Sequence, residues 1–325
     1  MTTTLPQTLT AAQESVRERI DRTYHQPLPD LLFEAQRMHR EHHDPRAVQL
    51  CTLCNIKTGL CPEDCGYCSQ SVHNKTELEP QPLADIETVL AEATAAKAHG
   101  STRFCMGAAW REVKDGAQFD RVLEMVRQVA ALQMEVCCTL GMLKPHQAQR
   151  LKEAGLTAYN HNLDTSPEYY GKVITTRTYQ DRLETIQAVS AAGISVCCGG
   201  ILGMGEAVDD RLSLLAALAA LDPLPESIPI NCLVPVAGTP LQNVAPVDSI
   251  ELVRMVATTR VLFPKAIVRL SAGRLQMSDE LQALCMLAGA NSIFTGPVLL
   301  TTPNPDSTQD EQLLKRLGMV PRVLQ

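Results

Sequence analysis

The fold class is indicated most clearly by the stretch at residues 180–198, which reads QDRLETIQAVSAAGISVCC. Its first part, Gln180–Ala192, carries apolar residues at helical spacing, and Gly193 stands where a helix commonly ends in the left-handed conformation. The apolar run Ser195–Cys198 that follows is typical of a short buried strand. A helix that leads directly into such a strand is the repeating element of an α/β protein.

The same alternation extends over most of the chain. Eight apolar or β-branched runs are predicted as strands, at residues 48–56, 102–106, 135–140, 158–162, 195–198, 228–233, 267–271 and 292–294. Eight helical patterns lie between and after them, at residues 85–99, 120–132, 145–154, 180–192, 209–221, 249–263, 278–288 and 309–317. The residues predicted just after helices are Gly100, Gly155, Gly193, Gly289 and Gly318, and the predicted N-caps are Asp85, Asp209, Ser249 and Ser278.

Eight strand-then-helix units favour one (β/α)8 TIM-type barrel, because βαβ connections make the strands parallel and eight of them can close. A doubly wound open sheet is the alternative, since a count of strands does not show closure. Residues 15–42 are predicted to form a two-piece helical lead-in, broken at Pro27 and Pro29, and residues 1–12 a frayed tail. We therefore expect an N-terminal tail and helical extension over residues 1–45 and one barrel domain over residues 46–325.

Composition narrows the possible partners and the cellular setting. The 325 residues include 29 basic and 36 acidic side chains, which gives a net charge of −7 and argues against nucleic acid or an anionic membrane as a partner. The longest mostly apolar stretch, Leu212–Leu221, is too short to span a bilayer. The N-terminus shows no secretory signal, so a cytoplasmic, reducing setting is expected. There, the 12 cysteines indicate metal binding, redox chemistry or burial rather than a disulfide scaffold.

The densest group of cysteines is Cys61-Pro-Glu-Asp-Cys65-Gly-Tyr-Cys68, directly after the first predicted strand. In a barrel this is the first strand-to-helix loop, where active-site residues are found. A structural zinc site takes four ligands, whereas an iron–sulfur cube held by three cysteines leaves one iron free to bind a substrate. The alternative is a zinc site built from two CxxC pairs, Cys51 with Cys54 and Cys65 with Cys68, which leaves Cys61 without a role.

A second set of chemically active residues falls on predicted strands. Cys105, Cys137, Cys197 and Arg269 lie on the second, third, fifth and seventh of them, whereas barrel interiors are normally filled with Val, Ile and Leu. If these side chains point inward, the guanidinium is unfavourable unless it is paired or acts as a ligand. A buried second metal cluster would satisfy all four. The alternative is that the cysteines are apolar filler and that Arg269 pairs with a carboxylate.

Several segments beside the CxxxCxxC motif resemble the biotin synthase family of the radical S-adenosylmethionine superfamily. They are residues 56–59 (IKTG), 102–110 (TRFCMGAAW), 159–167 (YNHNLDTSP), 200–206 (GILGMGE), 268–274 (VRLSAGR) and 301–305 (TTPNP). The resemblance runs from about Pro27 to Pro305. The cysteine motif alone indicates a radical enzyme, and the other segments indicate this family.

The resemblance implies two iron–sulfur clusters and a cofactor. Cys61, Cys65 and Cys68 would hold a [4Fe–4S] cluster, at which S-adenosylmethionine is cleaved to a 5′-deoxyadenosyl radical. A [2Fe–2S] cluster, the implied sulfur donor, would have the ligands Cys105, Cys137, Cys197 and Arg269. The implied contacts to S-adenosylmethionine are Tyr67, Asn162, Asp164, Arg182, Gly200 and Ile201.

The implied reaction is radical insertion of sulfur into dethiobiotin to give biotin, with Asn160, Asn162 and Asn231 lining the substrate pocket. No side chain is expected to act as a catalytic acid or base, because the clusters carry the chemistry. The resemblance also implies an electron-donor protein of flavodoxin or ferredoxin type and a homodimer. Cys51 and Cys54 are extra to the family pattern. Two alternative hypotheses remain for the function. One is a related radical methylase or lyase that acts on another small molecule, and the other is a zinc-stabilised binding protein.

Overall fold

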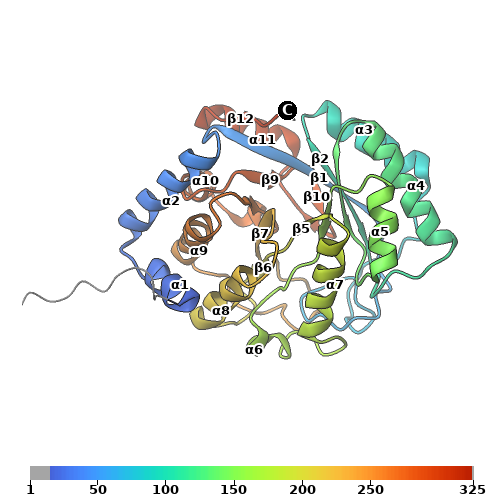
Figure 1. Cartoon of the computed structure of the whole chain (residues 1–325), viewed down its shortest axis with the longest axis horizontal. Helices are drawn as coiled ribbons and strands as arrows, with labels where there is room; N and C mark the ends of the chain where they lie inside the picture. The colour runs from blue at the N-terminus through green and yellow to red at the C-terminus, as the bar shows by residue number, and fades with distance from the viewer. Residues whose placement is uncertain (1–14, 324–325) are drawn as a thin grey trace, which may run out of the picture.

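Eight parallel strands follow one another around a barrel wall, and β1 pairs with both β2 and β9, so the sheet closes on itself (Figure 1). The computed structural model describes residues 15–323. The barrel strands are β1 (Ala47–Lys57), β2 (Arg103–Ala108), β3 (Glu135–Thr139), β4 (Ala158–Asn160), β5 (Ser195–Cys197), β7 (Ser227–Cys232), β8 (Ile267–Leu270) and β9 (Ser292–Phe294). The predicted barrel is confirmed, and the closure excludes the open sheet.

Helices cover the outside of this wall. They are α3 (Ile86–Ala98), α4 (Ala117–Ala131), α5 (Pro145–Glu153), α6 (Pro167–Tyr170), α7 (Tyr179–Ala191), α8 (Val208–Ala219), α9 (Ser249–Leu262), α10 (Asp279–Leu287) and α11 (Ser307–Leu317), with a 3₁₀ turn η1 (Arg274–Gln276). All five glycines predicted after helices have positive φ, from 67° to 104°, as a left-handed C-terminal residue requires. The helix ends were therefore readable from the glycine positions.

Two of the four predicted N-caps are wrong. Asp85 and Ser278 cap their helices as predicted. Helix α8 instead begins one residue before Asp209, and the N–H of its N-cap, Ala207, donates to a neighbouring aspartate side chain. Helix α9 begins at Ser249 itself, because the carboxylate of the preceding Asp248 accepts hydrogen bonds from two N–H groups of the first turn.

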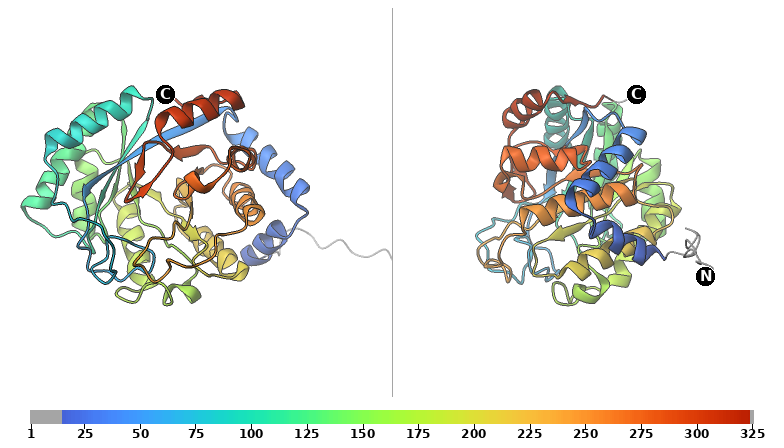
Figure 2. Two further views of the ribbon diagram at one scale, coloured as in Figure 1. Left: turned by 180° about the vertical axis from the view of Figure 1, so that it is seen from behind. Right: turned by 90° about the vertical axis from the view of Figure 1, so that its left-hand side faces the viewer.

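The N-terminal extension consists of α1 (Val16–Tyr24) and α2 (Leu28–His42), which lie against α8 and α9 on the outside of the barrel (Figures 1 and 2). The Tyr24 hydroxyl donates to Glu251 on α9, and the Arg254 side chain donates to the Tyr24 carbonyl oxygen at 2.6 Å. The predicted two-piece lead-in is confirmed with its break before Leu28, whereas Pro29 lies inside the first turn of α2, where proline is tolerated, and does not break the helix. The predicted frayed tail at residues 1–12 lies outside the described residues.

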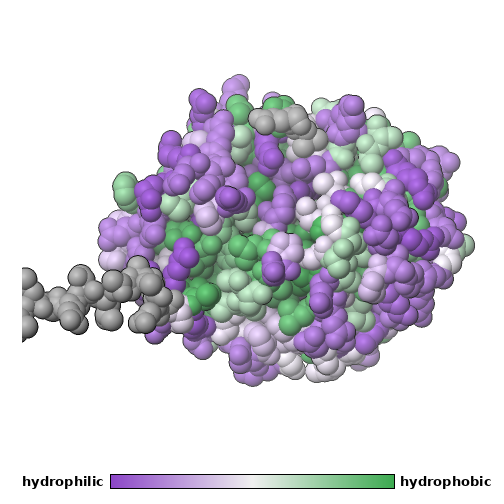
Figure 3. Space-filling view, viewed as in Figure 1, coloured by the Kyte–Doolittle hydropathy of each residue, from purple (hydrophilic) through white to green (hydrophobic). Residues whose placement is uncertain are grey.

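Four short strands lie outside the predicted set: β6 (Gly200–Leu202), β10 (Val298–Leu299), β11 (Thr302–Pro303) and β12 (Val320–Pro321). β6 extends the wall beside β7, β12 pairs with the start of β1, and β10 pairs with β11 as an antiparallel hairpin. Figure 3 shows a mostly hydrophilic face with apolar residues gathered over α8 and α9. Across residues 15–323, none of the helices combines the length and apolar character needed to cross a bilayer.

Strand alternation divides the cysteines between two environments. Cys138 and Cys198 pack in the large apolar core that includes the helices, whereas Cys105 and Cys137 form a separate buried group inside the barrel with Ala158. Successive side chains of a strand point to opposite faces, so adjacent cysteines must separate in this way. Cys105 and Cys137 therefore place their thiols inside the barrel.

Candidate active site

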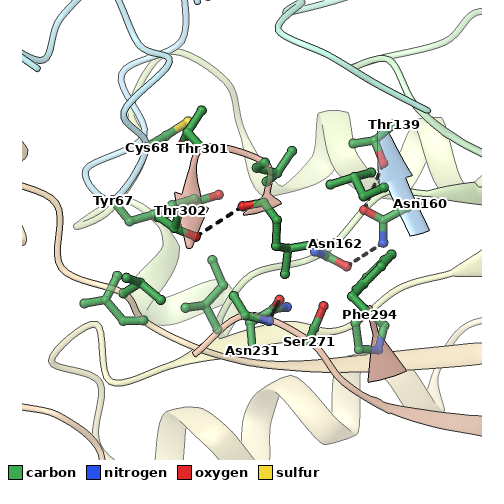
Figure 4. Close-up of a pocket in the computed structure, with 18 of the residues that line it drawn as sticks. Tyr67, Cys68, Thr139, Asn160, Asn162, Asn231, Ser271, Phe294, Thr301 and Thr302 are labelled. Atoms are coloured by element: carbon green, nitrogen blue, oxygen red, sulfur yellow. Dashed lines mark hydrogen bonds between the residues drawn. The ribbon is translucent and has the colours of Figure 1, made fainter. Parts of the chain in front are cut away.

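A cavity of about 210 Å³, measured as the space open to the centres of water-sized molecules, lies inside the barrel (Figure 4). Its wall includes Tyr67 and Cys68 from the loop after β1, and Cys105, Cys137 and Cys197 from the strands. Active sites of this barrel type lie at the carboxyl ends of the strands, where these loops meet. The cysteine loop and the inward-facing strand thiols therefore border one cavity.

The loop that carries Cys61, Cys65 and Cys68 is braced by hydrogen bonds. The side-chain amide of Asn74 donates to the carbonyl oxygens of Cys65 and Cys68, at 3.1 and 2.7 Å. The Asp64 carboxylate accepts from two backbone N–H groups in the segment before α7, at 2.9 and 3.1 Å. Hydrogen bonds within the chain therefore hold this loop in place.

The three thiols of the loop lie in a poorly hydrated setting. Burial raises the pKa of Cys65 to about 12 and that of Cys68 to about 11, and it also raises the pKa of Cys61. The positive charge of Arg177 opposes the shift at all three. Thiols with raised pKa values are neutral at pH 7, so binding iron displaces their protons.

The donor chemistry of this loop fits a cluster better than a single ion. Within residues 15–323, no three His, Cys, Asp or Glu side chains converge as ligands of one metal ion. A cube of four irons spreads its thiolate ligands over separate iron atoms, so they need not meet at one point. Three thiols on one braced loop at the cavity edge match that requirement.

Asp164 is the centre of a buried polar group beside the loop. Its carboxylate accepts a hydrogen bond from the Tyr67 hydroxyl at 2.8 Å and forms an ion pair with Arg182. The other guanidinium nitrogens of Arg182 donate to the Tyr170 hydroxyl and to the carbonyl oxygen of Asn162. Arg182 therefore positions the residues of the cavity wall rather than forming that wall.

The residues predicted to contact S-adenosylmethionine divide into two groups. Tyr67, Asn162, Asp164 and Ile201 line the cavity, whereas Arg182 and Gly200 lie directly behind its wall. A Cβ atom at position 200 would lie 2.9 Å from the Asp164 carbonyl oxygen and 2.3 Å from a methyl carbon of Leu214, so a larger residue would displace both groups.

The strand residues predicted for the second cluster converge in the barrel interior. Cys105, Cys137, Cys197 and Arg269 are each 3% exposed or less. Cys105 and Cys137 are paired neighbours on β2 and β3, and an Arg269 Nη1 hydrogen bond reaches the Cys197 sulfur at 3.6 Å. The predicted inward orientation is confirmed, and three thiols with one guanidinium form a donor set that fits a cluster.

Arg269 has neutral partners. Its Nε donates to Ser292 at 2.9 Å and its Nη2 to the side-chain oxygen of Gln49 at 3.1 Å. Among the residues that the structure describes, no carboxylate lies within ion-pair distance of Arg269, because the nearby acids Glu135 and Glu226 pair with Arg103. The alternative in which a carboxylate neutralises Arg269 is therefore wrong.

The CxxC zinc alternative is also wrong. Cys51 faces the barrel interior, where its sulfur lies 3.6 Å from the Ser292 hydroxyl. Cys54 packs in the outer core and interacts with Glu92 on α3. Residues three apart on a strand point to opposite faces, so these two thiols cannot bind one ion together.

Comparison with known proteins decides the family. The Radical SAM superfamily model matches residues 55–218, and the Biotin and Thiamin Synthesis associated domain model matches residues 229–320. A biotin synthase of Gloeobacter violaceus is 74% identical over 315 residues, covering 97% of this chain and 99% of the relative. The chain belongs to the biotin synthase family. A second biotin synthase, from Christiangramia forsetii, is 59% identical over 94% of this chain and 84% of its own length.

Two solved structures with low sequence identity share the fold. Methylornithine synthase matches with a TM-score of 0.80 at 17% identity, over 96% of this chain and 95% of the other. The hydrogenase maturase HydG of Carboxydothermus hydrogenoformans matches with a TM-score of 0.79 at 18% identity, over 96% of this chain and 77% of the other. As a member of the biotin synthase family, the chain is a radical S-adenosylmethionine enzyme that uses S-adenosylmethionine, a [4Fe–4S] cluster and a [2Fe–2S] cluster.

Two features of the cavity are not predicted from the sequence. Leu300, Thr301 and Thr302 of the β10–β11 hairpin line the cavity beside Tyr67 and Cys68 (Figure 4). In the sequence, this segment is informative only through the family resemblance, because two threonines before a proline carry no chemical signal of their own. The second is the hydrogen bonding around Arg269, which joins strands that are far apart in the sequence.

Proposed function

We propose that this protein inserts sulfur into dethiobiotin to form biotin. In this proposal Cys61, Cys65 and Cys68 hold the [4Fe–4S] cluster, and the ligands of the [2Fe–2S] cluster are Cys105, Cys137, Cys197 and Arg269. When bound, the two clusters with S-adenosylmethionine supply a hydrogen-abstracting radical and sulfur. The observation that carries the proposal is that Cys68 of the first donor set and all four residues of the second line a single cavity inside a closed barrel.

The chain itself supplies binding and orientation. Asn160 donates to the Asn162 side-chain oxygen at 3.0 Å and to the Cys197 sulfur at 3.4 Å, while its own oxygen accepts from Thr139 (Figure 4). Asn231 is held by the Gly200 carbonyl oxygen and the Ala272 N–H. Fixed amide groups of this kind are complementary to the cyclic urea of dethiobiotin, which needs both donors and acceptors.

The rest of the cavity wall protects the reaction. Leu53, Ile201, Phe294 and Leu299 give it a largely apolar lining. A closed apolar site excludes water and prevents side reactions of a reactive species. No proton transfer to or from a side chain is needed, so the proposal assigns no catalytic acid or base.

The proposal extends to the domain plan and the partners. The proposed plan divides the chain into an N-terminal extension at residues 1–45 and a barrel domain at residues 46–325. Within the described residues, the packing of α1 and α2 on the outside of α8 and α9 supports this division. An electron-donor protein of flavodoxin or ferredoxin type and a homodimer follow from the family resemblance, and the cytoplasmic setting follows from the N-terminal sequence.

The test is an anaerobic assay with S-adenosylmethionine, dethiobiotin and a reductant, in which 5′-deoxyadenosine and biotin are both measured. Cys61→Ala should abolish both products. Cys197→Ala should lose biotin while the first cluster still assembles, and Cys138→Ala, which alters a thiol in the outer core, should keep both products.

Biotin formation by Cys197→Ala at the wild-type rate would show that the sulfur-donor assignment is wrong. A wild-type protein that forms 5′-deoxyadenosine but no biotin would instead favour a radical methylase or lyase acting on another small molecule.

A further inference from the structure

Cys51 is a buried thiol to which the proposed reaction gives no role. It lies on β1 with its side chain inside the barrel and has no solvent exposure. Its sulfur lies 3.6 Å from the Ser292 hydroxyl, which accepts a hydrogen bond from Arg269 Nε at 2.9 Å. Arg269 in turn reaches the Cys197 sulfur. One serine side chain therefore separates Cys51 from the guanidinium of the proposed [2Fe–2S] site.

Two buried guanidinium groups lie near Cys51. Arg103 is its direct pairing partner on β2, Arg269 is reached through Ser292, and both arginines are 1% exposed. A cysteine binds metal as the thiolate, and neighbouring cations stabilise a metal-bound thiolate. If Arg269 is removed, Arg103 remains as a cation near Cys51.

Arg269 is the replaceable member of the donor set. Its contacts to Gln49 and Ser292 are hydrogen bonds to neutral groups, and such bonds hold a guanidinium less strongly than a carboxylate does. Thiolate is also the usual ligand of iron–sulfur clusters. A thiol that one serine side chain separates from the nitrogen ligand is thus placed to substitute for it.

We propose that Cys51 is a reserve ligand of the auxiliary site, supplying a fourth thiolate to the [2Fe–2S] cluster when Arg269 is not bound to iron. On binding, the thiol releases its proton to the buffer. The inference rests on the proposed function, because it presumes that the strand thiols hold this cluster.

The test is anaerobic reconstitution with iron and sulfide, followed by iron and sulfide analysis and visible absorption and circular dichroism spectra. The variants are Arg269→Met, the double variant Cys51→Ala with Arg269→Met, and the matched control Cys54→Ala with Arg269→Met. Cys54 is three residues along the same strand but faces α3. In each variant, the iron and sulfide content of the first cluster shows whether the chain is folded.

We expect Arg269→Met to keep the second cluster, with a spectrum changed by the exchange of nitrogen for sulfur. Adding Cys51→Ala should remove its two irons and two sulfides, about a third of the total, whereas adding Cys54→Ala should not. The inference is overturned if Arg269→Met loses the second cluster, or if adding Cys51→Ala leaves its content and spectrum unchanged.

A second pair of variants covers the case in which Arg269→Met does not fold. Arg269→Gln removes the guanidinium but keeps a polar side chain, and the inference expects it to retain the second cluster only while Cys51 is present. Equal loading of Arg269→Gln with and without Cys51→Ala overturns the inference. If the wild-type chain takes up only the first cluster, the proposed [2Fe–2S] site is wrong. That result differs from the results that overturn the role of Cys51, so the two failures can be distinguished.

Discussion

Replacing Asp164 with asparagine should destabilise the barrel far more than replacing an exposed carboxylate does. The side chains of Asp164 and Arg182 are 3% and 4% exposed. The charge of Asp164 raises the pKa of Arg182, although burial acts to lower it, so the guanidinium stays charged. Asparagine keeps the size of the side chain but leaves this buried charge without its counterion.

Breaking a buried pair by removing one partner costs about 3–5 kcal/mol of unfolding free energy. At about 2 °C per kcal/mol for a chain of this size, the melting temperature should fall by about 6–10 °C. The exposed pair of Glu124 and Arg127, with side chains 41% and 54% exposed, provides the control. Glu124→Gln should change the stability by about 1 kcal/mol or less.

The assay is thermal and urea unfolding of the cluster-free protein, followed by circular dichroism under anaerobic conditions. A second variant, Arg182→Met combined with Asp164→Asn, removes the uncompensated charge and should recover part of the loss. An Asp164→Asn protein that melts within about 2 °C of the wild type would refute the reasoning, since that shift is about 1 kcal/mol.

Two further predictions concern packing and pH. A Cβ at position 199 would lie 2.0 Å from the Pro229 carbonyl oxygen. Gly199→Ala should therefore lower the unfolding free energy by about 1–3 kcal/mol, measured by urea unfolding. An unchanged urea midpoint would contradict the tight contact. Burial, together with the charge of Arg260, lowers the pKa of His39 to about 3 from 6.5, so its contribution to stability is present above pH 6.5 and is lost as the pH falls toward 3. Between pH 7 and pH 5 the wild type should therefore lose about 2 kcal/mol more than His39→Met does, and equal losses would show that His39 is not the group responsible.

The sequence predicted the parts of the fold that depend on local patterns. The alternation of strands and helices, the glycines after helices and the inward orientation of Cys105, Cys137 and Cys197 each follow from spacing along a short segment. Two N-cap predictions failed: Asp248, adjacent to Ser249, accepts the N–H groups of the first turn of α9, and α8 begins one residue before Asp209. β6 was missed because it begins at a glycine, which weakens the strand pattern.

The site contacts that the sequence did not reveal join distant segments. Ser292 and Gln49 meet Arg269 only because β1 and β9 close the barrel, and Cys51 faces them for the same reason. Likewise, the role of Arg182 in holding Asp164 depends on the packing of α7 against the loop after β4. No periodicity in the chain encodes such contacts, so they require the three-dimensional structure.

The most direct test of the central claim is metal analysis of the anaerobically reconstituted protein, with its absorbance spectrum. Two clusters predict about six irons and six sulfides per chain, with separate [4Fe–4S] and [2Fe–2S] signatures. About four of each would keep the radical site but remove the sulfur-donor assignment. Bound zinc without sulfide would contradict the account.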